Sequence, residues 1–218
     1  SHVVLDLPVG PTAKVRSAEA ARLLSQDLVE IAGVFNLQAR AIITDGTQPV
    51  GRGIGPALEA RDVLAVLENA SNAPGDLRER SLLLAGTLLE MGGKAASGGG
   101  LALAESTLSS GHAIAKFERI CEAQGGMRKP PISAHRQTIV TQHAGRIVAV
   151  DNRRLSKVAK LAGAPDAKAA GVELHIALGD EVDRNQPLYT VHAETPGELA
   201  YALSYAKAND DIYRVTAP

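Results

Sequence analysis

Val3-Val-Leu-Asp-Leu7 and Ala39-Arg-Ala-Ile-Ile-Thr44 are two short apolar runs near the start of the chain. Apolar residues recur at helical spacing between them, and Ser17 can cap a helix over residues 18–34. A strand, a helix and a second strand joined by short links form a βαβ unit, so the two strands should pair in parallel. The first run is almost continuously apolar, which predicts a strand buried on both faces.

The chain begins directly with this strand, as Ser1-His-Val-Val, without a Met. Chain termini fray, so a buried strand seldom starts at a free end. We therefore expect this chain to be a piece of a longer polypeptide. The alternative is a natural start from which the initiator Met has been removed.

The predicted type of secondary structure changes once along the rest of the chain. Helical patterns fill almost all of residues 56–124, whereas short strands and two short helices are predicted after residue 136. Gly and Pro residues between them indicate a linker. The expected fold class is α/β: a partial parallel sheet with helices over 1–126, a linker over 127–135, and a small α+β domain over 136–218.

Composition excludes several classes of protein. The 218 residues carry a formal net charge of −1, only 3% aromatic residues and a single cysteine, Cys121. This balance offers no general attraction for a nucleic acid polymer or a membrane surface, and one cysteine cannot form an intrachain disulfide. We expect a cytoplasmic protein in which Cys121 is a small buried hydrophobe.

The six histidines show no spacing typical of a zinc site, and we assign no metal ligand and no catalytic residue. Gly51, Gly53 and Gly55 precede a helix that should begin at Pro56. Backbone amides at a helix start can bind phosphate, but this spacing differs from the dinucleotide fingerprint. Close backbone packing explains the glycines at least as well, so both interpretations stay open.

Lys14 is the one candidate for substrate binding. It follows the first predicted strand, and parallel sheets place ligands at the carboxyl ends of their strands. An ammonium group there could bind a phosphate as a point charge. The alternative is a solvated surface lysine.

Three longer strings resemble one family. They are Val4-Leu-Asp-Leu-Pro-Val-Gly-Pro-Thr-Ala-Lys-Val-Arg-Ser17, Thr44-Asp-Gly-Thr-Gln-Pro-Val-Gly-Arg-Gly-Ile-Gly-Pro-Ala-Leu-Glu-Ala-Arg61, and the stretch from Leu178-Gly-Asp-Glu-Val182 to Gln186-Pro-Leu-Tyr-Thr-Val-His192. Together they are similar to the thymidine phosphorylase / AMP phosphorylase family, in its long form with an extra N-terminal domain. The resemblance covers essentially the whole chain.

The resemblance implies phosphorolysis of a pyrimidine nucleoside or a nucleoside 5′-monophosphate. Inorganic phosphate is then the co-substrate, and no other cofactor is implied. The family's phosphate loop and base-binding helix lie N-terminal to the segment that resembles Val4–Ser17, so this chain should be a C-terminal fragment that is inactive by itself. The complete enzyme should be a homodimer or a larger homo-oligomer.

The resemblance bears on single residues as well. In the AMP phosphorylase branch a lysine in this loop binds the nucleotide, and Lys14 matches it. The potassium site of the pyrimidine-nucleoside branch would correspond to Val50, Gly53 and Asp62, which all differ in residue type from that site, so we assign no potassium site.

A non-catalytic assembly or oligomerisation module is the alternative function. The turn at Gly179-Asp-Glu-Val182 resembles that of lipoyl and biotinyl carrier domains, which carry a modified lysine at a hairpin tip. Here the tip is Asp183-Arg-Asn185 and holds no lysine, so a swinging-arm role is not expected.

Overall fold

The first two strands pair as the sequence predicts. In the computed structural model, which describes residues 2–216, β1 (His2–Val9) and β2 (Gln38–Asp45) are parallel and in register over their full lengths. They are joined by α1 (Ala18–Val34), whose first turn is capped by Ser17: its Oγ accepts a hydrogen bond from the Ala20 amide at 3.1 Å. The predicted βαβ unit and the limits of its helix are confirmed.

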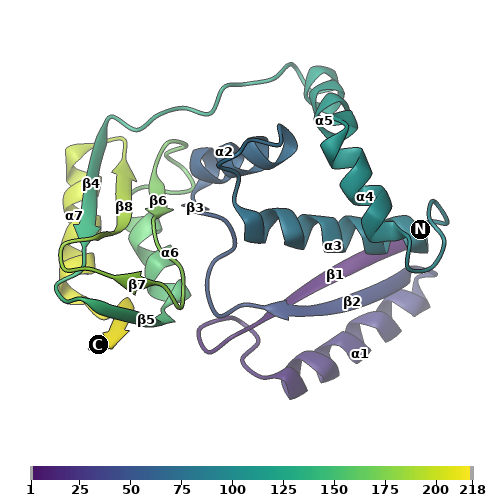
Figure 1. The fold of residues 1–218 in the computed structure, drawn as a ribbon, viewed down its shortest axis with the longest axis horizontal. Coiled ribbons are helices and arrows are strands. Elements are labelled where there is room, and N and C mark those ends of the chain that lie inside the picture. The colour runs from purple at the N-terminus through teal and green to yellow at the C-terminus, as the bar shows by residue number, and fades with distance from the viewer. Residues whose placement is uncertain (1, 217–218) are drawn as a thin grey trace. The chain divides into compact units, whose positions relative to one another are not determined.

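The burial expected for the first strand is wrong for the part of the chain that the structure describes. Leu7 is the one buried side chain of β1, and the others are half-buried or exposed. Within residues 2–216, β1 pairs with β2 alone, with α1 on one side of the pair and α3 on the other (Figure 1). A two-stranded sheet has too little surface to bury both faces of either strand.

Helices predominate between β2 and the linker, as predicted. They are α2 (Pro56–Leu67), α3 (Gly75–Met91), α4 (Gly100–Ser109) and α5 (His112–Ala123). Gly92 and Gly93 end α3, and Gly93 has the positive φ of 65° that glycine adopts without strain. Gly111, at φ 78°, separates α4 from α5.

The chain divides into two compact units, which are described separately. The first contains residues 1–46 and 63–128, and the second contains residues 47–62 and 129–218. The segment 47–62, which holds the short strand β3 (Gly53–Ile54) and the start of α2, thus belongs with the C-terminal residues. The sequence did not suggest this assignment, because nothing local in 47–62 reveals a partner more than 100 residues away.

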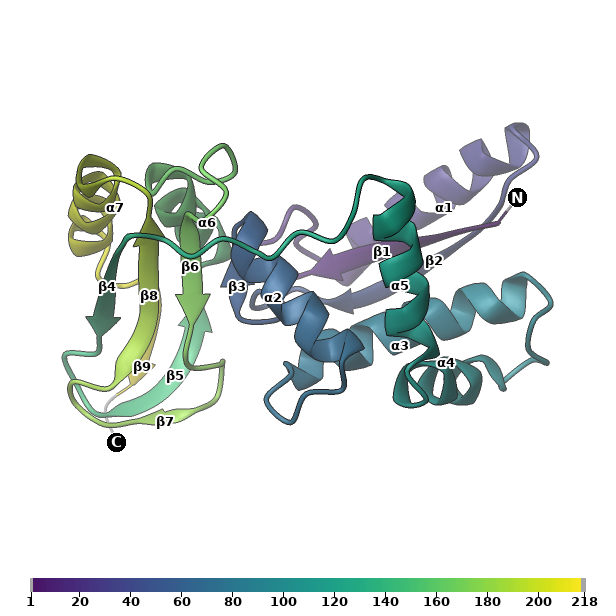
Figure 2. The same ribbon diagram turned by 90° about the horizontal axis from the view of Figure 1, so that it is seen from above.

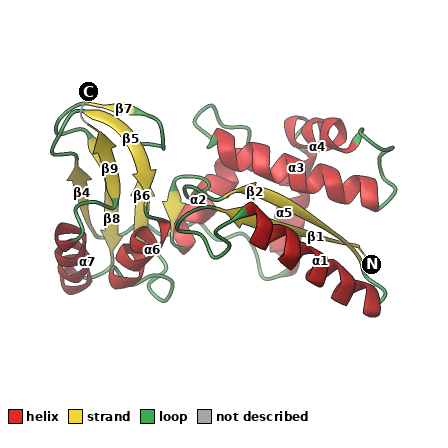
Figure 3. Cartoon of the chain, turned by 90° about the horizontal axis from the view of Figure 1, so that it is seen from below, coloured by secondary structure: helices red, strands yellow, loops and turns green. Residues whose placement is uncertain are grey.

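The second unit contains two antiparallel sheets. One has the strand order β3–β6–β8–β4 and the other β7–β5–β9. The strands are β4 (His135–Val140), β5 (Gly145–Val150), β6 (Gly171–Leu174), β7 (Glu181–Val182), β8 (Pro187–Ala193) and β9 (Tyr213–Thr216). The helices α6 (Asn152–Leu161) and α7 (Pro196–Ala208) lie next to each other on one side of the strands (Figures 2 and 3).

The core of the second unit lies between these helices and the sheets. Leu155 and Val158 of α6 are fully buried, as are Val172 of β6 and Val191 of β8. Tyr189 stacks on Tyr213 with ring centroids 5.9 Å apart, and burial raises the pKa of Tyr189 to about 12. The phenol of Tyr189 therefore stays neutral in the core at any physiological pH.

The expected fold class, a partial α/β domain followed by a small α+β domain, is confirmed by these elements. The domain limits of 1–126 and 136–218 remain a prediction. Residues 126–134 form no helix or strand, as expected of a linker.

The linker should be the first site of proteolysis. Arg128 is exposed in the linker, whereas Arg119 is exposed on the regular helix α5. A protease needs an extended, accessible backbone, so limited trypsin treatment should cut first after Arg128. Arg128→Gln should remove this first cut, and the matched change Arg119→Gln should leave it in place, as read by mass spectrometry of the products. A first cut within α1 would contradict the prediction.

Candidate functional site

Lys14 lies in the loop after the carboxyl end of β1, where the sequence places it. The backbone of this loop is ordered: the Gly10 amide donates to the Val15 carbonyl at 3.2 Å, and Val15 bridges to Val9. The Gly46 amide donates to the Val9 carbonyl at 2.8 Å, which ties this loop to the end of β2. The Lys14 side chain is exposed, so its ammonium group is accessible to a ligand.

A polar network holds the same two strands from the side of α3. Asp6 of β1 accepts hydrogen bonds from the Thr44 hydroxyl at 2.5 Å and from Arg80 Nη1 at 3.1 Å. The Nη2 of Arg80 donates to the Asp45 carbonyl at 2.7 Å. The Arg80 side chain is only 16% exposed, so this ion pair is partly shielded from water. Arg80 therefore fixes the strand ends that carry the Lys14 loop.

The glycine segment before α2 is built for close packing. An ideal Cβ on Gly53 would stand 2.5 Å from the Leu58 carbonyl carbon, and one on Gly55 would stand 2.3 Å from the Ala170 carbonyl oxygen. Gly55 also has a φ of +133°, which side chains with a Cβ rarely adopt. These glycines let β3 approach the helix start and the turn before β6.

Three backbone amides of this segment donate hydrogen bonds to carboxylates of the chain itself. Asp62, which is buried, accepts from the Arg52 amide at 2.6 Å and from the Gly53 amide at 2.7 Å, and it also binds the Arg52 guanidinium at 3.2 Å. The Gly55 amide donates to Glu59 Oε1 at 2.9 Å. Of the two interpretations of the glycines, close packing is the one that this arrangement supports. The carboxylate of Asp62 orders the loop with both of its oxygens.

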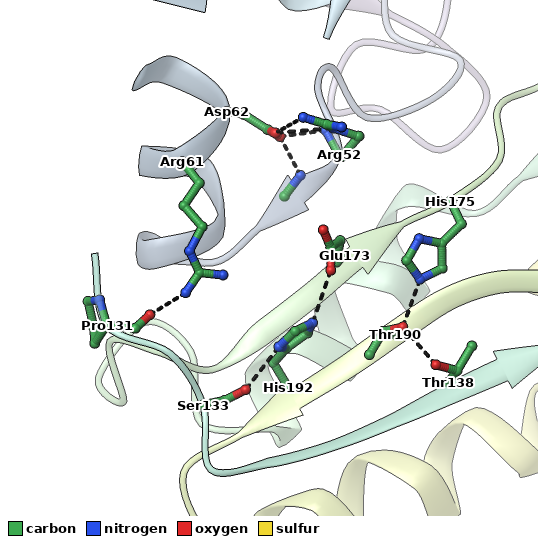
Figure 4. A network of polar contacts seen from close by, with 11 residues as sticks. Arg52, Arg61, Asp62, Pro131, Ser133, Thr138, Glu173, His175, Thr190 and His192 are labelled. Carbon is green, nitrogen blue, oxygen red and sulfur yellow. Dashed lines mark hydrogen bonds and ion pairs between the residues drawn. The ribbon is translucent and has the colours of Figure 1, made fainter. Parts of the chain in front are cut away.

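The sheet β3–β6–β8–β4 has one apolar and one polar face. Strand alternation places Val172, Leu174, Tyr189 and Val191 toward the core. On the opposite face, β6 contributes Glu173, and β8 contributes Thr190 and His192. The Thr190 hydroxyl lies 2.7 Å from His175 Nε2 and 2.9 Å from the Thr138 hydroxyl (Figure 4). A shallow cavity of about 500 Å³ opens beside Thr138, His175 and Thr190.

His192 is the most buried titratable group on this face. Its Nδ1 lies 2.9 Å from the Oγ of Ser133 in the linker, and its Nε2 lies 3.4 Å from Glu173 Oε2 (Figure 4). Hydrogen bonding with the His192 imidazole is the largest effect on the Glu173 carboxyl and lowers its pKa, helped by the charges of His192, His175 and Arg52 and opposed by burial. The carboxylate therefore stays ionised at neutral pH.

The first unit contains an apolar cavity. A cavity of about 530 Å³ lies among α2, α3, α4 and α5 and is lined mainly by leucine, valine and alanine side chains, including Val66, Leu82 and Leu108. Such a lining suits an apolar occupant rather than a phosphorylated ligand.

Cys121 of α5 is only partly buried, so the expectation of a buried cysteine is wrong.

Within residues 2–216, no group of three or more His, Cys, Asp or Glu side chains is placed to hold a metal ion. None of the helices in this range is long and apolar enough to cross a bilayer.

Sequence reasoning missed the network around His192. Ser133 and His192 are 59 residues apart, and no motif connects them. The one signal in the sequence was alternation: Thr190 and His192 are polar residues two positions apart in the otherwise apolar strand β8, and Glu173 of β6 is followed two positions later by His175.

Comparison with known proteins agrees with the three strings. Residues 146–212 match the family described as the pyrimidine nucleoside phosphorylase C-terminal domain. A "putative thymidine phosphorylase" of Polaromonas sp. strain JS666 is 58% identical over 215 residues, which are 99% of this chain and 42% of that protein. The chain is similar in sequence to proteins named putative thymidine phosphorylase. A protein of the same name from Chelativorans sp. strain BNC1 is 59% identical over 217 residues, and one from Sphingopyxis alaskensis is 57% identical over 216 residues.

The resemblance found in the sequence is thereby confirmed for the thymidine phosphorylases. The chain spans less than half the length of these curated relatives, 42–43% in the three cases. The match to the C-terminal domain family lies in the second unit and includes the Leu178–His192 string.

Proposed function

We propose that the complete protein transfers a pentosyl group to inorganic phosphate. Phosphate attacks C1′ of a pyrimidine nucleoside or a nucleoside 5′-monophosphate, the glycosidic C–N bond breaks, and the base leaves with the bonding electrons and takes up a proton. The observation that carries this proposal is the 55–59% identity to thymidine phosphorylases over 99–100% of the chain.

Within this proposal the first unit, which contains Lys14, supplies part of the substrate site. No cofactor beyond the co-substrate phosphate is proposed, and neither a nucleic acid polymer nor a membrane is a proposed partner. We expect the complete protein to work in the cytoplasm as a homodimer or a larger homo-oligomer, as its resemblance to the family implies.

We assign Lys14 to the 5′-phosphate of a nucleotide substrate. The exposed ammonium group on an ordered strand-end loop supports this role, because a phosphate needs an accessible cation on a fixed backbone. The resemblance of the loop to the AMP phosphorylase branch points to the same ligand. Lys14 would then bind and orient the substrate without touching the bond that breaks.

Lys14→Ala in the complete protein tests the assignment. A charge-assisted hydrogen bond to phosphate is worth roughly 1.5–3 kcal/mol, so kcat/KM for a nucleoside monophosphate should fall about ten- to a hundredfold. Turnover of the matching nucleoside should hardly change, because it offers no phosphate at that position. Steady-state rates with AMP and adenosine, and with CMP and cytidine, measure both.

Two controls make the result specific. Arg16→Ala removes a positive charge from another exposed residue of the same loop and should have a small effect on both substrates. Lys14→Arg should restore part of the nucleotide activity. Equal losses with nucleotide and nucleoside would show a structural role for Lys14, and no loss with either would show a solvated lysine; both results contradict the assignment.

A further inference from the structure

The first unit buries far fewer apolar side chains than the second, although the two units are similar in length. In the second unit, eighteen buried apolar residues form one core cluster. Among the described residues of the first unit, the buried apolar ones are Leu7, Ala21, Val66, Leu82, Ala104 and Leu108, and the last four form its core cluster. Burial of apolar area is the main favourable contribution to folding, so the first unit gains little of it from its own residues.

The apolar cavity among α2, α3, α4 and α5 lies beside this small cluster, and all four members of the cluster line it (Figure 2). Leu77, Ser81, Ala85 and Leu88 line it from α3, at spacings that place them along one face of the helix. Leu88 is 44% exposed, and Ser81 and Ala85 are exposed as well. The described residues therefore leave one face of α3 open along the cavity.

The lining determines which chemistry the cavity accepts. Lys94 is the one charged residue among the described residues that line it, and leucine, valine and alanine predominate. A lining of this kind binds apolar side chains and offers few groups to a phosphate. Its walls are helices, so another helix with apolar residues three and four positions apart can pack its ridges between theirs.

The length of the curated relatives indicates where such a segment comes from. This chain spans 42–43% of them, so more than half of each relative lies outside the matched region. A unit with a small core of its own needs its apolar partner at all times. A segment of the same polypeptide meets this need, because the covalent link gives it a high effective concentration at any protein concentration.

We propose that the cavity among α2, α3, α4 and α5 receives an apolar segment of the complete protein from outside these 218 residues. The segment completes the core that Leu82 and Leu108 begin, and it covers the open face of α3 at Ala85 and Leu88. This packing is independent of the reaction that the protein catalyses.

Thiol modification of the complete protein and of the 218-residue chain tests the proposal. All native cysteines, including Cys121, are first replaced by serine. A packed thiol reacts only when the structure opens locally, so Leu88→Cys should react with a maleimide about tenfold or more slowly in the complete protein than in the 218-residue chain. Ala85→Cys, a smaller change in the same lining, should show the same protection. Mass spectrometry over time measures the rates.

Leu83→Cys is the matched control. Leu83 lies on the same helix and is 43% exposed, but it does not line the cavity. Its cysteine should react at similar rates in both proteins, which separates cover of the cavity from a general stabilisation of α3. Equal protection of Leu83→Cys and Leu88→Cys in the complete protein would contradict the proposal.

Two further outcomes would overturn it. One is an unchanged rate for both Leu88→Cys and Ala85→Cys between the two proteins. The other is protection of these cysteines in the 218-residue chain that rises with its concentration, because a second copy of the chain would then be the occupant. Protection in a complete protein that releases no base would support this packing while rejecting the proposed phosphorolysis, so the two proposals can fail separately.

Discussion

The 218-residue chain, incubated with phosphate and thymidine, uridine, AMP or CMP, should release no free base. Phosphorolysis requires phosphate to be held in line with C1′, and a large part of the rate comes from this positioning. The chain spans 42–43% of its curated relatives, and the resemblance places the phosphate loop and the base-binding helix outside it. Chromatographic detection of free base measures the result.

The complete protein, assayed at the same concentration, is the positive control. Its activity would show that the assay conditions are adequate, so that a lack of base release by the 218-residue chain can be attributed to that chain. Turnover by the 218-residue chain at a rate comparable to the complete protein would show that residues 1–218 hold the whole catalytic site, and the proposed division of the site would be wrong.

Asp62→Ala should lower the free energy of unfolding of the second unit. The change removes the acceptor of two backbone amides, Arg52 and Gly53, and leaves the Arg52 guanidinium without its ion-pair partner. Leaving hydrogen-bond donors without their acceptor costs about 1–3 kcal/mol, a noticeable share of the roughly 5–15 kcal/mol that stabilises a typical domain. The ion pair adds little to this cost, because the Arg52 side chain is 40% exposed to water. The segment 47–62 should then separate from β6, because β3 loses the carboxylate that shapes it.

Tyrosine fluorescence during urea unfolding measures this effect on the second unit alone. The chain has no Trp, and its four tyrosines, at positions 189, 201, 205 and 213, all lie in that unit. The exposed residue Asp166 provides the matched control: Asp166→Ala should leave the unfolding midpoint within error of the unchanged chain. Equal midpoints for Asp62→Ala and Asp166→Ala would mean that Asp62 does not hold the segment.

Local patterns in the sequence were sufficient for most elements. The limits of α1 and the parallel pairing of β1 with β2 follow from helical spacing, the Ser17 cap and the short links between elements. The start of α2 at Pro56 and the end of α3 at Gly92 follow from the fixed φ of proline and the freedom of glycine. Each of these signals acts within a few residues, which is why a sequence reveals it.

The position of the candidate site was also accessible from the sequence, because the strand-to-loop order alone places Lys14 at a carboxyl end of the sheet. The role of the glycine segment could not be decided from the sequence. Whether Gly53 and Gly55 bind a ligand or admit a neighbouring backbone depends on Leu58, on Ala170 and on the carboxylate of Asp62. Such partners are set by the path of the chain in space.

Sequence patterns were enough for most of the helices and longer strands, for the parallel strand pair and for the resemblance to the thymidine phosphorylases, because each rests on local spacing or on strings of similar residues. Two features are visible only in the folded chain: residues 47–62 pack with the C-terminal unit, and Ser133, His192 and Glu173 meet on one sheet face. These contacts join residues far apart in the chain, and their free energy comes from burial and charge pairing that exist only once the sheets have formed.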